Sequence, residues 1–74
     1  MTLDMLKPGE SAVVAELQSQ GAERNRMLDL GIVPGTRLEA VMRSPLGDPM
    51  AYRVRSSVIA LRREQAGRIR IELL

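Results

Sequence analysis

The segment at residues 31–36, Gly-Ile-Val-Pro-Gly-Thr, makes the chain change direction twice within six residues. Gly31 suits the left-handed position that ends many helices, and Pro34 prevents a helix from continuing. The four residues Val33 to Thr36 then place proline second and Gly35 third, as a type II turn requires. Any fold of this chain must therefore contain a helix end and a tight turn here, with an extended segment directly after them.

The segment before this reversal, residues 22–30, is predicted to form a short helix. Its sequence, AERNRMLDL, is rich in helix-forming residues. Ile32 follows at the position that contacts Met27 when a helix ends in a left-handed glycine. Asp29 breaks a local rule, because a carboxylate in the last turn faces the negative end of the helix dipole. We expect a compensating contact, either with the following turn or with Arg26 three residues back.

Five short segments have the composition and alternation of β-strands. These predicted strands are residues 11–18, 37–43, 50–55, 58–61 and 68–73. Turn-forming clusters separate them, including KPGE at 7–10 and PLGDP at 45–49, and residues 62–66 are expected to form one helical turn.

In the second predicted strand, the apolar Leu38, Ala40 and Met42 are expected to share one face, opposite the charged residues. Only Val41 interrupts this alternation. Residues 56–57 are expected to be the tight connection between the third and fourth strands.

This arrangement predicts a mainly β fold with one short helix between the first and second strands. Five strands in so few residues favour a small, strongly bent sheet that closes into a barrel, because an open sheet could not cover its own faces. The chain contains no repeat, no low-complexity tract and no long linker. We expect one domain over residues 1–74.

The composition narrows the chemistry that the chain can perform. It has no cysteine and no histidine, which removes the usual ligands of zinc, haem and iron–sulfur centres. The carboxylates are scattered, so we expect neither a metal site nor a cofactor. Its Ser and Thr hydroxyls have no histidine to activate them, so we expect no catalytic residues. Absence of cysteine and of a signal-like N-terminus favours the cytoplasm.

Nucleic-acid binding is an alternative hypothesis, in which outward arginines contact phosphates. The candidate arginines, which could share one side, are Arg53, Arg55, Arg62, Arg63, Arg68 and Arg70. Against this stand a formal net charge of only +2 and a single aromatic residue, Tyr52, for stacking on bases. We therefore expect no nucleic acid among the partners.

Four blocks in register resemble the FeoA family, the small accessory proteins of bacterial ferrous iron transport. The blocks are LKPGESA at 6–12, RMLDLGIVPGT at 26–36, SPLGDPMAYRV at 44–54 and VIALRREQAGRIRI at 58–71. Together they span nearly the whole chain.

The resemblance implies an SH3-like barrel and a non-enzymatic function as an accessory or regulator of iron uptake. It implies a partner, the membrane GTPase transporter FeoB, with docking on the cytoplasmic part of that protein. The chain would then lie in the cytoplasm, peripheral to the inner membrane through its partner, and weak self-association is conceivable.

Two sets of residues follow from this comparison. Those that match the family and have a structural reason or an expected core role are Gly9, Leu28, Gly31, Pro34, Gly35 and Leu61. Those expected to contact the partner, near the helix and the 45–49 loop, are Arg24, Arg26, Leu46, Asp48, Tyr52 and Arg62.

Overall fold

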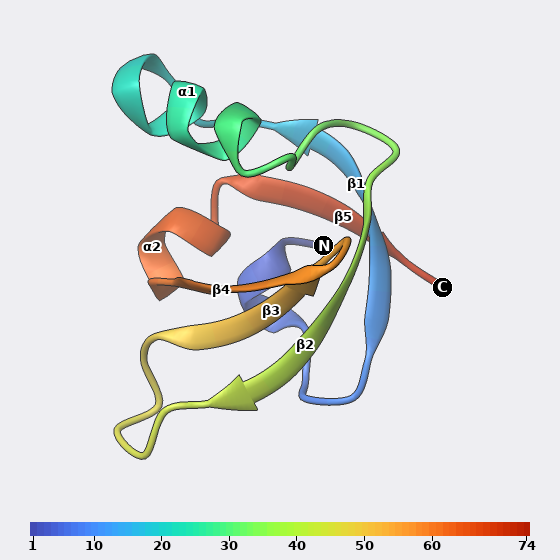
Figure 1. Cartoon of the computed structure of the whole chain (residues 1–74), viewed down its shortest axis with the longest axis vertical. Helices are drawn as coiled ribbons and strands as arrows, with labels where there is room; N and C mark the ends of the chain where they lie inside the picture. The colour runs from blue at the N-terminus through green and yellow to red at the C-terminus, as the bar shows by residue number, and fades with distance from the viewer.

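Five antiparallel strands form one curled sheet in the computed structural model, which describes residues 1–74 (Figure 1). The elements are η1 (Leu3–Met5), β1 (Ser11–Leu17), α1 (Gly21–Asp29), β2 (Arg37–Arg43), β3 (Met50–Val54), β4 (Ser57–Leu61), α2 (Arg63–Ala66) and β5 (Ile69–Leu73). The strand order is β4-β3-β2-β1-β5. The predicted mainly β fold, with its helix between the first two strands, is confirmed.

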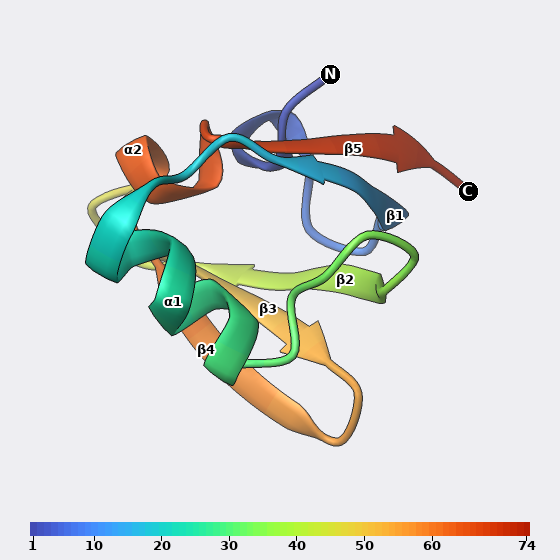
Figure 2. The same ribbon diagram turned by 90° about the horizontal axis from the view of Figure 1, so that it is seen from above.

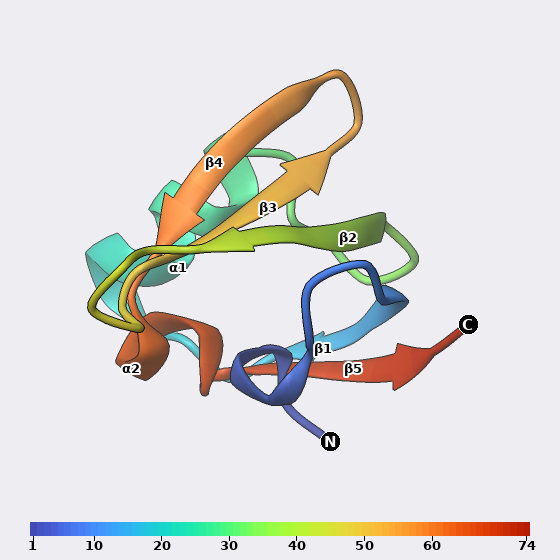
Figure 3. The same ribbon diagram turned by 90° about the horizontal axis from the view of Figure 1, so that it is seen from below.

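Two β-bulges bend this sheet. The register shifts between Val14 and Glu16 where β1 pairs with β5, and between Ala40 and Met42 where β2 pairs with β3. An extra residue in one strand bends that strand and increases its twist. The two end strands of the sheet, β4 and β5, are connected by α2, and η1 packs on α2 and β5 (Figures 2 and 3).

The concave side of the sheet holds the hydrophobic core. Its members are Leu3, Leu6, Ala12, Val14, Leu17, Met27, Ile32, Leu38, Ala40, Met50, Tyr52, Val54, Leu61, Ala66, Ile69 and Ile71. Leu61 is fully buried, in agreement with the core role expected of it. The N-terminal segment was not predicted to be structured, yet η1 and the residue after it supply two fully buried leucines, Leu3 and Leu6.

The end of α1 has the predicted geometry. The Ile32 N–H donates to the Met27 carbonyl at 2.9 Å, and the Gly31 N–H donates to the Leu28 carbonyl at 3.0 Å. These two bonds define the Schellman motif, which requires the positive φ of +87° found at Gly31. Met27 and Ile32 are fully buried, so their predicted contact closes the helix end over the core.

The turn that follows also has its predicted form and is fixed to β1. The Thr36 N–H donates to the Val33 carbonyl at 2.9 Å, and Gly35, the third turn residue, has a φ of +92°. The Gly35 N–H then donates to the Val14 carbonyl at 2.8 Å, and the Val14 N–H donates to the Thr36 carbonyl at 2.9 Å. The Thr36 hydroxyl donates to the Gly31 carbonyl at 3.0 Å, so one side chain ties the turn to the helix end.

Two expectations for α1 were wrong. Leu28 is 39% exposed and takes no part in the core, because α1 buries only Met27. Asp29 is exposed and forms no ion pair with Arg26. Water solvates its carboxylate, which removes the need for the compensating contact.

Met42 is a further correction, because it points outward and is 63% exposed. The bulge at Val41 is the reason: Ala40 pairs with Tyr52, whereas Met42 pairs with Ala51, so Val41 is the extra residue. A one-residue shift moves every later side chain of a strand to the opposite face.

The outward position of Met42 can be tested by stability. We expect Met42→Gln to change the free energy of unfolding by less than about 0.5 kcal/mol, as is usual at exposed sites. Leu38→Ala, on the buried face of the same strand, should cost about 2–5 kcal/mol. Urea unfolding of the two variants gives both values, and a large loss in Met42→Gln would contradict the bulged register.

The two positive-φ glycines give a second stability test. Gly35→Ala should lower the free energy of unfolding by about 1–2 kcal/mol, because a Cβ is strained at positive φ. Gly31→Ala should lose at least as much, since its Cβ would also lie 3.2 Å from the Nε of Arg55. Asparagine tolerates positive φ, so Gly35→Asn should recover part of the loss. Equal urea midpoints for Gly35→Ala and the parent chain would refute the requirement for a glycine at this position.

Candidate partner-binding surface

The six residues predicted to contact a partner fall into two separate exposed groups and one buried residue. Leu46, Asp48 and Arg62 belong to the loop after β2 and to the start of α2, at one end of the molecule. Arg24 and Arg26 lie on α1 at the other end, with α2 between the two groups (Figure 1). The sixth residue, Tyr52, lies inside the core.

Leu46 is the most exposed large apolar side chain, at 94%. The loop that carries it is held at its base, because the Ser44 N–H donates to the Pro49 carbonyl at 3.0 Å and the Gly47 N–H donates to the Ser44 carbonyl at 2.8 Å. A rigid loop of this kind presents a side chain without a large loss of conformational entropy on binding.

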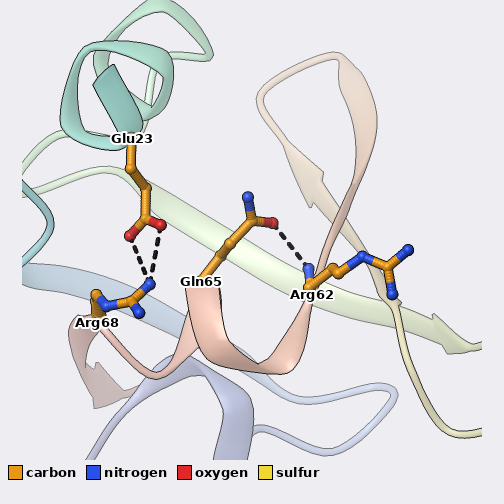
Figure 4. Close-up of polar contacts among 4 residues, drawn as sticks. All are labelled: Glu23, Arg62, Gln65 and Arg68. Carbon is orange, nitrogen blue, oxygen red and sulfur yellow. Dashed lines mark hydrogen bonds and ion pairs between the residues drawn. The ribbon is translucent and has the colours of Figure 1, made fainter. Parts of the chain in front are cut away.

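Asp48 and Arg62 fix the loop and α2 to each other. The Asp48 carboxylate accepts the Arg63 N–H at 2.9 Å, which satisfies the first donor of α2. The Arg62 N–H donates to the Gln65 side chain at 3.0 Å, while the Arg62 guanidinium extends away from it (Figure 4). Asp48 thus has an internal function, whereas the Arg62 guanidinium is free to meet a partner.

The helix α1 is tied to the sheet by one ion pair, in which a single guanidinium nitrogen contacts both oxygens of a carboxylate. Arg68, directly before β5, donates to both carboxylate oxygens of Glu23 at 2.9 and 3.0 Å (Figure 4). Arg24 contacts the Leu17 carbonyl at 3.4 Å, and Arg26 is exposed. The exposed arginines of α1 therefore stand on a helix whose position is fixed at its first turn.

Tyr52 was wrongly predicted to contact a partner, because it is only 1% exposed. Its hydroxyl donates to the Leu3 carbonyl at 3.4 Å. Burial raises the pKa of Tyr52 to about 12, and the charge of Asp4 adds to the effect. The alternation of the 50–55 segment already placed Tyr52 with Met50 and Val54 on one face, and this signal identifies it as a core residue.

The raised pKa predicts how stability changes at alkaline pH. Between pH 10 and 12 the unfolded chain loses the Tyr52 proton while the folded chain keeps it. The stabilisation is therefore complete below pH 10, and about 2–3 kcal/mol is lost as pH rises to 12. The ultraviolet absorbance of the phenolate should titrate near pH 12. Tyr52→Phe is the control, because it should remove this part of the pH dependence. A midpoint near 10 would mean that Tyr52 is accessible.

A row of apolar side chains, which we call the apolar strip, lies beside the exposed loop. Met42 pairs with Ala51 and Ala51 pairs with Ala60, so the three side chains stand in line across β2, β3 and β4. Together with Ser44 and Pro49 they line a shallow hollow of about 190 Å³. This surface was not predicted from the sequence, although the interrupted alternation at Val41 was the signal for the bulge that creates it.

A second surface, the basic groove, lies on the outer side of β2 and β3. It has a volume of about 460 Å³. The residues that line it are Ser11, Gly35, Thr36, Arg37, Leu38, Glu39, Arg53 and Arg55. Arg53 forms an ion pair with Glu39 at 3.5 Å, whereas Arg37 and Arg55 have no ion-pair partner.

Arg55 was predicted to end a strand, with residues 56–57 as the connection, and this was wrong. Val54 pairs with Ser57, so the turn consists of Arg55 and Ser56. Arg55 has a φ of +57° and is the only residue besides glycines with positive φ. It occupies the first position of a two-residue turn, where glycine is the usual choice.

The six outward arginines do not form one phosphate-binding side. Arg53, Arg68 and Arg70 each form an ion pair with a glutamate. Arg70 lies on β5 and Arg53 on β3, which are separated by two strands of the sheet. With Tyr52 buried, no aromatic side chain is exposed to stack on a base.

No group of three or more histidine, cysteine, aspartate or glutamate side chains is placed to hold a metal ion. None of the helices has the length and apolar character needed to cross a lipid bilayer. The exposed features are instead those of a contact surface: a fixed loop, an apolar strip and a basic groove.

Comparison with known proteins decides the family. The FeoA domain model matches residues 1–73. The chain belongs to the FeoA family. Members of this family are accessory factors of ferrous iron transport and are not known to be enzymes.

One curated FeoA relative is physically joined to a transporter. It is a fusion of Fe(2+) transport protein A and the Fe(2+) transporter FeoB from Porphyromonas gingivalis, 38% identical over 74 residues. The match covers the whole of this chain but only 9% of the fusion protein.

Solved FeoA structures confirm the architecture. The FeoA protein of Chlorobium tepidum superimposes with a TM-score of 0.94 at 35% identity, over the whole of this chain and 70% of that one. Stenotrophomonas maltophilia FeoA, solved with zinc and described as a prokaryotic SH3 domain protein, gives 0.86 at 33% identity, covering 97% and 89% of the two chains. The SH3-like fold expected from the resemblance is thus confirmed.

Proposed function

We propose that this FeoA-family chain is a non-enzymatic accessory of ferrous iron uptake that docks on the cytoplasmic part of a FeoB-type membrane GTPase transporter. The observation that carries the proposal is the relative in which FeoA and FeoB form one polypeptide. Fusion keeps two domains at high effective concentration, which is useful when they act on each other. The chain would then work in the cytoplasm, at the membrane only through its partner.

The proposed docking surface is the apolar strip with Leu46 and Arg62 beside it. Met42 and Leu46 are 63% and 94% exposed, although both are large apolar side chains. Burying them against a partner would remove apolar area from water, and the Arg62 guanidinium at the rim can pair with a carboxylate. Asp48 supports this surface by anchoring the loop to α2.

Arg24 and Arg26 would form a second contact, separate from the strip. They lie on α1, which the Glu23–Arg68 pair holds against β5. Two separated contacts allow the small domain to bridge two parts of the transporter. If those parts move relative to each other between nucleotide states, differential binding shifts the population of the transporter states.

Leu46 gives the direct test of this docking surface. Leu46→Asp should leave stability within about 0.5 kcal/mol of the parent chain, because the side chain is almost fully exposed. Its affinity for the cytoplasmic domain of a FeoB-type transporter should fall about tenfold or more, as at interface hot spots. Calorimetry or fluorescence anisotropy measures the affinity.

Leu74→Asp is the matched control, since Leu74 is also exposed, at 67%, but lies at the C-terminus, far from the loop (Figure 1). It should bind like the parent chain. Failure of the parent chain to bind either the cytoplasmic domain or the full transporter would overturn the proposed function.

A further inference from the structure

The basic groove carries the whole net charge of the chain. Its three arginines and one glutamate give a net +2, equal to the formal net charge of all 74 residues. The charges outside the groove therefore cancel one another. The Arg37 and Arg55 guanidinium groups have no ion-pair partner, so they retain donors for an incoming anion.

The fold holds Arg55 at the groove in an unfavourable conformation. A residue with a Cβ is disfavoured at a φ of +57°, and glycine would fit this turn position better. The Arg55 side chain crosses the end of α1, where its Nε lies 3.2 Å from the position that a Cβ of Gly31 would occupy. Two unusual positions, an arginine in a glycine site and a glycine beneath it, thus place one guanidinium at the groove.

The lining of the groove selects the chemistry of its ligand. Leu38 is its only hydrophobic lining residue and is 1% exposed, so the side chains that an incoming molecule meets are mainly charged or polar. No aromatic side chain lines the groove, so it offers no surface on which a nucleic-acid base could stack. Arginine forks match the planar carboxylates of aspartate and glutamate.

The spacing of the arginines fits an extended chain. Glu39 pairs with Arg53 across β2 and β3, and Arg37 is two residues from Glu39 on the same face. Residues two apart in a strand are about 7 Å apart and point the same way. An extended segment with acidic residues at positions i and i+2 would place one carboxylate at Arg53 and the next at Arg37 and Arg55.

We propose that the basic groove binds an acidic, extended segment of the partner protein. This step rests on the proposed function: the segment belongs to the FeoB-type transporter. The groove is then a contact additional to the apolar strip.

The first test uses a defined probe, the peptide acetyl-(Glu-Ser)4-amide, and backbone amide shifts of the whole chain. We expect saturable shifts at Ser11, Thr36, Arg37 and Arg53, and a loss of affinity of about tenfold in Arg37→Ala and in Arg55→Gly. Arg55→Gly is informative because it relieves the positive φ, so the variant should unfold at the same or higher urea concentration. If Arg55 instead stabilised the fold, Arg55→Gly would unfold at a lower urea concentration than the parent chain.

Arg70→Ala is the matched control, because Arg70 pairs with Glu16 across β1 and β5, away from the groove. It should bind the peptide like the parent chain. Shifts outside the groove, or unchanged affinity in both groove variants, would overturn the proposal. Stronger shifts with the oligonucleotide (dT)8 than with the peptide would also overturn it and assign the groove to phosphate.

The second test uses the cytoplasmic domain of the transporter and separates the two proposals. Weaker binding of Arg55→Gly than of the parent chain supports the groove as a contact. Equal binding of the two overturns this assignment but leaves the proposed function standing. If the parent chain binds the acidic peptide but no part of the transporter, the proposed function fails and the groove belongs to another acidic partner.

Discussion

The two β-bulges, in β1 and in β2, are the constraint on which the rest of this structure depends. A sheet of five short strands can enclose a core only if it curls tightly, and each bulge supplies a local bend. The second bulge has another effect, because it turns Met42 outward beside Ala51 and Ala60. The device that closes the core therefore also creates the apolar strip, so Val41 influences both stability and the contact surface.

The sequence was sufficient to predict most of the fold. Turn residues with a strict conformational requirement, such as Gly31 and Gly35, located the helix end and the turn to the residue, since few other residues fit there. The predicted bounds of the strands were close to the observed ones, because apolar and polar residues alternate every two residues in a strand. The bulge at Val41 and the turn at Arg55 were missed, because both depend on the register with β3 and β4, which a single strand does not reveal.

The candidate surface was harder to predict than the fold. Leu46 is exposed, because a leucine between proline and glycine in a hairpin loop has no core to enter, and its contact with a partner stays a prediction. Tyr52 was misplaced, although its own alternation pointed inward. The basic groove could not be predicted, since it joins the turn at Gly35, the face of β2 and the hairpin of Arg55, and only the folded sheet brings these segments together.

The position of β4 at the end of the sheet affects how the molecules behave toward one another. An edge strand with exposed apolar side chains, here Val58 and Ala60, is a template on which another chain can add a strand. Arg55 and Arg62 bound this strand at its two ends. Antiparallel pairing of two copies of β4 would set the arginines of one copy beside those of the other, and this repulsion opposes dimerisation through this edge. The two charges thus protect an edge strand whose apolar side chains are exposed.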